Sequence, residues 1–375
     1  MRFTVYSNDW FLEKLDNVCQ FVRDGTHGSF KDVEIGIPLL SAKDIFDGKI
    51  NINENSRLIS IDDYNTIHKN YELTKGDILL TIVGTIGRTA MINMDEKFTL
   101  QRSVAILRVN EQISYNFLYY YIQTSAFQNR LKSVVNQSAQ GGVYLNSLKK
   151  LNIKLTADMN EQNKISSFLS IIDKKIELLE QKYQYYQEFK KYLMQQIFTQ
   201  KLRFNFDEIR LKSISKINKG KQLNKEHMLE IGKFYVLNGG QEPSGYTDSW
   251  NTSENTVTIS EGGNSCGFVN FNTEKFWSGG HCYYLNKLSE NIDVYYLYSY
   301  LKFIEPQIMR LRVGSGLPNI QKGDIENIKI KILPKKEQIK ISNLLLSTDN
   351  KISSIESQKD SFEIFKKGLL QQMFV

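Results

Sequence analysis

Apolar side chains recur with the period of a coiled coil between residues 161 and 198. Their steps alternate between four and three residues, which is the spacing of the a and d positions of a heptad repeat. No proline or glycine interrupts the stretch. The pattern predicts one long helix, about 57 Å for 38 residues. Its seam positions are Ile165, Leu169, Ile172, Ile176, Leu179, Tyr183, Tyr186, Lys190, Leu193 and Ile197.

The same stretch occurs a second time, from residue 337 to residue 374, without a gap in register. Each residue lies 176 positions after its counterpart (337 minus 161), so that the pair Glu161-Gln162 recurs as Glu337-Gln338. This period is far longer than that of a solenoid repeat, and it indicates a duplicated half-protein. The second seam consists of Ile341, Leu345, Thr348, Ile352, Ile355, Lys359, Phe362, Lys366, Leu369 and Met373.

The two predicted helices are expected to pair with each other, because neither could bury its apolar stripe on a single compact domain. The alternative is that each helix caps its own domain. Parallel and antiparallel pairing both fit the pattern. The antiparallel coiled coil places the two preceding domains at opposite ends, related by a pseudo-two-fold axis. Lys190 and Lys366 occupy equivalent seam positions, where a lysine either fixes the register of the pair or extends to solvent.

The duplication extends upstream of the helices, but only in segments. Val143 matches Ile320 at an offset of 177 residues, and residues 96–98 match residues 274–276 at an offset of 178. The loops between these segments differ. Two copies of one scaffold that carry different loops suit a protein that recognises two different targets with the same arrangement of scaffold elements. The alternative is an old duplication without functional asymmetry.

Each half is predicted to be α+β with short strands. We expect buried strands at residues 76–84, 103–109 and 255–260, the first of them entering a glycine turn. Residues 116–131 carry Tyr and Phe at helical spacing, and we expect this face to be core rather than a platform for stacking bases. The expected order is a first domain at 1–158, a helix at 159–200, a second domain at 201–335 with its connector at 201–207, and a helix at 336–375.

The composition is that of a globular protein, with 375 residues of which 41% are hydrophobic. The net charge of +7 is compatible with an acidic partner such as nucleic acid, although a lysine-rich compositional bias produces the same value. The N-terminus lacks the apolar core of a signal peptide, and no apolar run is long enough to span a membrane, so we expect a cytoplasmic protein without a membrane partner. Cys19, Cys266 and Cys282 lack CxxC spacing and indicate neither disulfides nor a zinc site.

No catalytic motif is found in the sequence. The P-loop pattern GxxxxGK(S/T), GxSxG and HExxH are absent, and residues 314–319 fail the last position of GxGxxG. The five prolines are never adjacent, which excludes the Pro-Pro-aromatic loop with which amino-methyltransferases hold a target amine. His27 has no catalytic partner in sequence, and His281 has no spaced metal ligands beyond Cys282. We therefore predict a protein that is not an enzyme, with no catalytic residue and no metal site.

Together, these features resemble the specificity (S) subunit of type I restriction–modification systems. The resemblance covers essentially the whole chain and is carried by two domains, each followed by a long helix that opens with Glu-Gln. Local segments typical of the family are residues 24–27, residues 76–79 running into 84–87, and residues 314–320 before a strand. The first half departs from the Gly-rich pattern at residues 138–143, which read Ser-Ala-Gln-Gly-Gly-Val.

The resemblance implies a non-catalytic subunit for DNA modification and host defence. Such a subunit has two target recognition domains and holds two methyltransferase (modification) subunits through its helices. It assembles further with restriction/translocase subunits. It directs adenine methylation at a split, asymmetric site in double-stranded DNA, in which two specified half-sites flank an unspecified spacer. S-adenosylmethionine and ATP with Mg²⁺ would belong to the partner subunits, and this chain would need no cofactor.

Candidate DNA-binding residues are side chains in the divergent loops that can bond base edges, such as Arg or Lys to guanine and Asn or Gln to adenine. Some of them would instead bind phosphate or remain solvated. In the first half they are Thr26, His27, Arg88, Gln101, Arg102, Asn136, Gln137 and Gln140. In the second half they are Lys221, Gln222, Asn238, Gln241, Tyr246, Asn264, His281, Arg310, Arg312 and Asn319.

Two other functions fit the same pattern. A free-standing, two-headed DNA-binding or architectural coiled-coil protein would bind a specific duplex tightly without a methyltransferase, whereas a specificity subunit is expected to bind poorly alone. A coiled-coil scaffold without a nucleic-acid role would show no salt-sensitive DNA binding.

Overall fold

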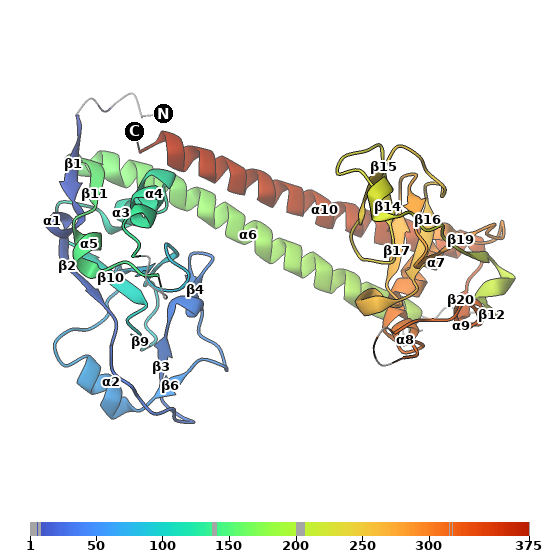
Figure 1. The fold of residues 1–375 in the computed structure, drawn as a ribbon, viewed down its shortest axis with the longest axis horizontal. Helices are drawn as coiled ribbons and strands as arrows, with labels where there is room; N and C mark the ends of the chain where they lie inside the picture. The colour runs from blue at the N-terminus through green and yellow to red at the C-terminus, as the bar shows by residue number, and fades with distance from the viewer. Residues whose placement is uncertain are drawn as a thin grey trace. The chain divides into compact units, whose positions relative to one another are not determined.

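The computed structural model describes residue 6 and residues 9–136, 141–199, 207–314, 316 and 318–374. The chain divides into two compact units. Unit 1 comprises Met1–Leu179 and Gln358–Val375, and unit 2 comprises Glu180–Ser357. Each unit contains one β-rich domain together with part of each long helix (Figure 1).

The two long helices are α6 (Met159–Phe198) and α10 (Lys335–Gln372). In unit 2, Tyr183 donates to Glu356 at 3.4 Å, and Lys190 pairs with Asp349 at 2.5 Å. Residue numbers rise along α6 while they fall along α10, so the pairing of the two helices is antiparallel. The predicted seam residues are buried or half-buried throughout both helices, which confirms the heptad assignment.

The seam lysines are held by aspartates of the opposite helix. In unit 2 this is the Lys190–Asp349 pair, and in unit 1 Lys366 pairs with Asp173 at 2.6 Å. A tyrosine of the neighbouring domain adds a third member, because Tyr120 donates to Asp173 at 2.9 Å and Tyr295 donates to Asp349. Of the two roles open to these lysines, the contacts favour fixing the register over extending to solvent.

The domain of unit 1 is built on a four-stranded antiparallel sheet in the order β2-β10-β7-β8. Smaller sheets of order β1-β11, β6-β3-β9 and β4-β5 surround it. The strands are β1 (Trp10–Lys14), β2 (Cys19–Asp24), β3 (Ile37–Leu40), β4 (Ile45–Phe46), β5 (Lys49–Ile50), β6 (Leu58–Ile59), β7 (Ile78–Thr81), β8 (Thr89–Met91), β9 (Thr99–Leu100), β10 (Val104–Val109) and β11 (Asn152–Thr156). The helices are α1 (Leu15–Val18), α2 (Ile61–Ile67), α3 (Tyr115–Tyr121), α4 (Ser125–Ser133) and α5 (Leu145–Lys149).

The domain of unit 2 repeats this design. Its four-stranded antiparallel sheet has the order β13-β19-β16-β17, and a three-stranded sheet has the order β15-β14-β18. The strands are β12 (Asp207–Arg210), β13 (Lys216–Lys219), β14 (Phe234–Leu237), β15 (Gly245–Thr247), β16 (Thr256–Ser260), β17 (Val269–Asn272), β18 (Trp277–Ser278), β19 (Cys282–Asn286) and β20 (Lys329–Ile332). The helices are α7 (Val294–Phe303), α8 (Glu305–Met309) and α9 (Lys322–Glu326).

The glutamine of each Glu-Gln pair ties the start of a long helix to its domain. Gln162 is fully buried; its amide donates to the carbonyls of Thr156 and Gln112, and its oxygen accepts from the N–H of Ser114. Gln338 makes the equivalent bonds to Leu333, Asn291 and Asp293. Because an unpaired buried amide is costly, each glutamine satisfies backbone groups that would otherwise be orphaned.

The predicted strands at 76–84, 103–109 and 255–260 are present as β7, β10 and β16. The aromatic face of residues 116–131 is core, since Phe117, Tyr120 and Phe127 are buried in the main hydrophobic cluster of unit 1. The fold class predicted from sequence is therefore confirmed. The connector expected at 201–207 lies outside the described residues, except for Asp207.

Candidate nucleic-acid interface

One end of the four-stranded sheet of unit 1 gathers loops from four strands. Strands β2 and β7 end there, and β10 and β8 begin there, because neighbouring strands are antiparallel. We call the loops at this end the strand-end surface of unit 1. They comprise residues 24–27, 82–88 and 101–103, together with Asn136 and residues 141–142, which join them through backbone bridges.

Thr26 and Arg102 are held side by side by backbone hydrogen bonds. The N–H of Thr26 donates to Leu100 at 2.7 Å, and the N–H of Arg102 donates to Thr26 at 3.0 Å. Gly25 is required for this approach, since a Cβ at this residue would lie 2.1 Å from the carbonyl oxygen of Leu100. The side chain of Arg102 is left exposed, as a DNA contact requires.

The glycine loop after β7 joins the same surface. Val83 bridges Gly142, and Gly142 bridges Asn136, whose amide donates to the Tyr144 hydroxyl at 2.9 Å. Arg88 lies at the end of this loop with an exposed side chain. These bridges bring three predicted segments, far apart in sequence, to one surface.

Unit 2 has the equivalent strand-end surface, formed by residues 219–222, 261–268 and 279–281 with 313–314 and 318–319. Gly220 takes the place of Gly25, with its N–H donating to Cys282 at 2.8 Å, and a Cβ there would lie 2.2 Å from the carbonyl oxygen of Gly279. Gly262 bridges Asn319, as Val83 bridges Gly142. The same backbone therefore presents Lys221 and Gln222 where unit 1 presents Thr26 and His27.

The two strand-end surfaces differ most at a buried acid. Glu261, 4% exposed, follows β16 where Ile82 follows β7 in unit 1. Its carboxylate accepts from Lys219 at 2.5 Å and from the Tyr283 hydroxyl at 3.0 Å, and it lies 3.4 Å from Nδ1 of His281. Burial, and then the bond to Glu261, raise the pKa of Tyr283, so this hydroxyl remains a donor. One buried carboxylate thus positions two exposed basic side chains.

Sequence reasoning missed four residues of these surfaces. Asp24 pairs with Nε2 of His27 at 2.7 Å, and Ser103 accepts from the N–H of Ala42 at 3.0 Å. Lys219 and Glu261 form the pair described above. A sequence signal existed for Asp24, Lys219 and Glu261, because each lies at or just after the end of a strand and directly precedes a glycine.

The structure describes sixteen of the eighteen candidate residues, since Gln137 and Gln140 lie outside the described ranges. Most of the sixteen belong to the two surfaces or adjoin them; Asn238, for example, accepts from the N–H of His281 at 3.4 Å. Gln241 and Tyr246 lie instead on the β14–β15 hairpin, and Arg310 caps the end of α8. The exposed candidates are His27, Arg88, Arg102, Asn136, Lys221, Gln222, Gln241, Tyr246, Asn264, His281, Arg310 and Arg312, and the half-buried ones are Thr26, Gln101, Asn238 and Asn319.

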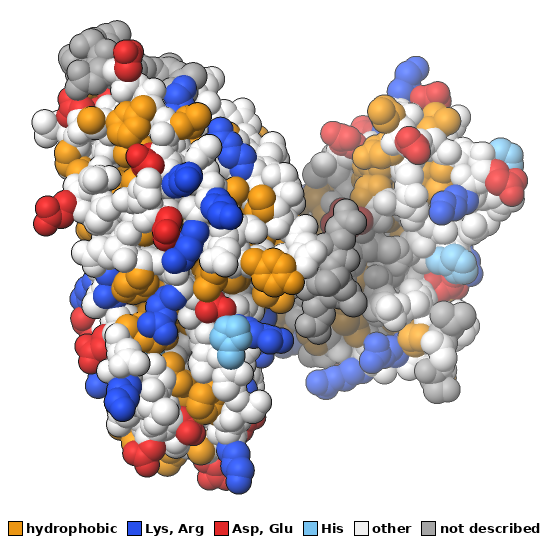
Figure 2. Space-filling view, turned by 60° about the vertical axis from the view of Figure 1, so that its left-hand side comes forward, with side chains coloured by type: hydrophobic (Ala, Val, Ile, Leu, Met, Phe, Trp, Pro, Cys, Tyr) orange, Lys and Arg blue, Asp and Glu red, His pale blue; other side chains and the backbone are white. Residues whose placement is uncertain are grey.

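On the face of unit 1 that Figure 2 shows, basic side chains lie in small groups with acidic ones between them.

The model of the "Type I restriction modification DNA specificity domain" matches residues 9–185 and again residues 205–363. The chain belongs to this family. A putative type I restriction enzyme specificity subunit of Methanocaldococcus jannaschii is 26% identical over 96% of this chain and 92% of its own length. The EcoBI specificity subunit of Escherichia coli is 28% identical over 42% of this chain and 33% of its own.

Solved structures agree in fold. A type I S subunit from M. genitalium superimposes with a TM-score of 0.71 over 98% of this chain and 96% of its own, at 20% identity. A second solved chain comes from work on complex assembly and conformational transition of the type I R-M system. It superimposes with a TM-score of 0.56 over 97% of this chain and 98% of its own, at 16% identity.

The chain is therefore the DNA specificity subunit of a type I restriction–modification system and is a non-catalytic member of it. Among the described residues, no cluster of His, Cys, Asp or Glu could hold a metal ion. No helix in the described parts of this specificity subunit is long and apolar enough to cross a membrane.

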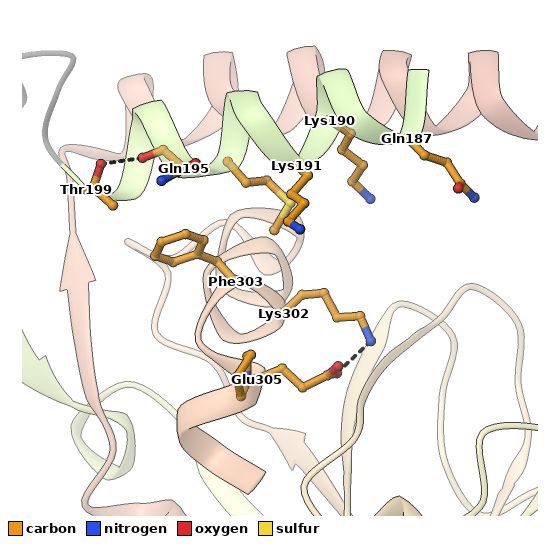
Figure 3. Close-up of a pocket in the computed structure, with 10 residues that line it drawn as sticks. Gln187, Lys190, Lys191, Gln195, Thr199, Lys302, Phe303 and Glu305 are labelled. Atoms are coloured by element: carbon orange, nitrogen blue, oxygen red, sulfur yellow. Dashed lines mark hydrogen bonds and ion pairs between the residues drawn. The ribbon is translucent and has the colours of Figure 1, made fainter. Parts of the chain in front are cut away.

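A pocket of about 520 Å³ lies in unit 2 between the end of α6 and helices α7 and α8 (Figure 3). Its apolar wall includes Met194 and Phe303. Two of its charged groups serve the fold of the specificity subunit, since Lys302 pairs with Glu305 at 2.6 Å and Glu305 accepts from the N–H of Val269. We assign no ligand to this pocket.

Proposed function

We propose that this specificity subunit reads a split, asymmetric site in duplex DNA, with each domain recognising one half-site. The observation that carries the proposal is the equivalence of the two strand-end surfaces: the same backbone framework presents different side chains. Lys221 and Gln222 replace Thr26 and His27, and Glu261 replaces Ile82. A shared scaffold with different polar edges suits recognition of two different base sequences.

The residues proposed to contact DNA are those that the sequence singled out, with Lys219 added. The proposed domain limits are 1–158 and 201–335 for the recognition domains, with 159–200 and 336–375 for the helices. We further propose that His27 and Arg102 in the first domain, and Lys221, Gln222 and His281 in the second, include the base-reading side chains. Their exposed polar groups supply the donors and acceptors that base edges match.

The partners proposed are two methyltransferase subunits, docked along α6 and α10, and restriction/translocase subunits that join them in the cytoplasm. S-adenosylmethionine, and ATP with Mg²⁺, are proposed to bind those partners. The non-catalytic nature of the family supports this division of labour, since the methyl-transfer and translocation steps must be supplied by other chains.

The test is a genome-wide map of N6-methyladenine in a methylation-free host that expresses this chain with the methyltransferase encoded beside it. We expect a split motif that appears only when this chain is present and disappears when residues 205–375 are deleted. Methylation without the chain, or a continuous motif, would contradict the proposal.

A further inference from the structure

Arg23, near the end of β2, is a half-buried arginine without a polar partner. Its guanidinium makes no hydrogen bond and no ion pair with the residues that the structure describes, and its Nε is buried. The acid next to it in sequence, Asp24, pairs instead with His27 at 2.7 Å. Unused donors on a half-buried cation are costly, because burial removes the water that would otherwise satisfy them.

A column of aromatic side chains holds Arg23 in place. Its Cζ lies 3.5 Å from the centre of the Tyr71 ring, and the centres of the Tyr71 and His68 rings are 4.7 Å apart. Tyr64 closes the column, 4.4 Å from His68. His68 is fixed by hydrogen bonds with the carbonyl of Tyr71 at 3.1 Å and the hydroxyl of Thr99 at 2.9 Å. The arginine is therefore ordered before any ligand arrives, which lowers the entropic cost of binding.

The equivalent position of unit 2 carries no such cation. Counted back from the matching glycines, Gly25 and Gly220, Arg23 corresponds to Asn218 of β13. The amide of Asn218 donates to the side-chain oxygen of Asn286 at 2.8 Å. An asparagine with a partner inside the domain thus suffices at this position of the sheet. The shared scaffold does not require the arginine of unit 1.

The place of Arg23 in the sheet indicates its ligand. It lies two residues before Gly25 and is set back from the strand-end surface that carries His27 and Arg102. Tyr71 covers one face of the guanidinium and Nε is buried, so the terminal N–H groups are left to meet an acceptor. These groups match phosphate oxygens, and phosphates flank the base edges that the loops are proposed to read.

We propose that Arg23 binds a backbone phosphate of the duplex beside the first half-site, and that Tyr71 and His68 position it. This inference rests on the proposed function, because it adds a DNA contact to the first domain. Unit 2 has Asn218 at this position, so the contact belongs to one domain only. It fixes where the duplex lies without selecting a base.

The test uses the full-length chain purified with the neighbouring methyltransferase, and duplexes with and without the methylated motif mapped in the genome. Binding is measured over a series of salt concentrations. Arg23→Asn, which copies Asn218, should weaken binding to both duplexes on the order of 10-fold. The slope of log K against log salt should decrease in magnitude by about one, as expected for the loss of one phosphate contact. The methylated motif should stay the same.

Three further variants separate this contact from a general loss of charge or stability. Arg23→Lys keeps the charge and should keep the wild-type salt slope. Lys75→Asn removes a positive charge at the opposite end of β7, where Lys75 pairs with Asp95 at 2.8 Å, and should change neither affinity nor slope. Tyr71→Leu should weaken binding less than Arg23→Asn does. Combined with Arg23→Asn, it should cause no further loss, since the two residues act through one contact.

Four results would overturn the inference. Wild-type affinity and slope in Arg23→Asn would show that Arg23 is not a DNA contact, while leaving the proposed function intact. An altered first half-site with an unchanged salt slope would identify Arg23 as a base-reading residue instead. Losses that add fully in the double variant would remove Tyr71 from the positioning role. A wild-type complex that binds both duplexes equally would contradict the proposed function itself.

Discussion

At the scale of single residues, Glu261 and Ile82 occupy equivalent backbone positions in the two units, but one side chain is a carboxylate and the other is apolar. Both are buried directly after a central strand of the four-stranded sheet. Ile82 contributes to the apolar core of unit 1, whereas Glu261 holds Lys219 and His281. A buried carboxylate persists only when it is paired and hydrogen-bonded. This cost suggests that Glu261 serves to position the two basic side chains rather than to stabilise the sheet.

Glu261→Gln should relax base discrimination at the half-site read by the second domain and leave the other half-site unchanged. The amide keeps the shape of the side chain but removes the negative charge that pairs with Lys219 and lies 3.4 Å from Nδ1 of His281. Misplacing one good base contact costs about 1–3 kcal/mol of discrimination. The measurement is the methylated fraction at sites with a single mismatch in either half. Equal relaxation at both half-sites, or none at either, would show that Glu261 has no positioning role.

At the scale of elements, the antiparallel helices are fixed by charged pairs embedded in an apolar seam. Lys366 with Asp173 and Lys190 with Asp349 are related by the duplication, since each lysine meets the aspartate of the other copy. Displacing the helices by one heptad would separate both lysines from their acids and from the tyrosines that complete each group. Such pairs specify register more than they add stability.

Asp173→Asn should lower the free energy of unfolding by about 1–2 kcal/mol, because it leaves a half-buried lysine without its acid. Asp349→Asn is the matched variant in unit 2 and should have a similar effect. A double-mutant cycle with Lys366→Met, followed by chemical denaturation, measures the coupling directly. A coupling energy near zero would indicate that Lys366 and Asp173 are neighbours without a role in register.

Sequence alone predicted the seam residues, the antiparallel option and the buried aromatic helix α3, because heptads and apolar spacing are local signals. The partners of the seam lysines could not be predicted, since they depend on which acid the opposite helix brings alongside. The equivalence of Gly25 and Gly220 was also missed. Their offset of 195 residues (220 minus 25) differs from the 176 of the helices, because insertions in the loops shift the register. Only the shared hydrogen bonds to the sheet reveal the correspondence.

At the scale of the whole molecule, each unit combines a scaffold that both units share with its own strand-end surface. The four-stranded sheets have the same order and strand directions, and the buried glutamines Gln162 and Gln338 make the same bonds. The loops at one end of each sheet differ in their side chains, and unit 1 adds α2 and the β4–β5 hairpin. We infer that the two domains can be exchanged independently, since the loops proposed to contact DNA do not contribute to the helix seam.

The most direct test of the account is an exchange of residues 207–334 for the corresponding domain of another specificity subunit of known target. The exchanged chain is expressed with the methyltransferase in a methylation-free host, and methylated adenines are mapped across the genome. The account predicts that one half-site changes to that of the donor while the other half-site is kept. A motif altered in both halves, from a complex that still methylates DNA, would contradict the independent reading of two half-sites.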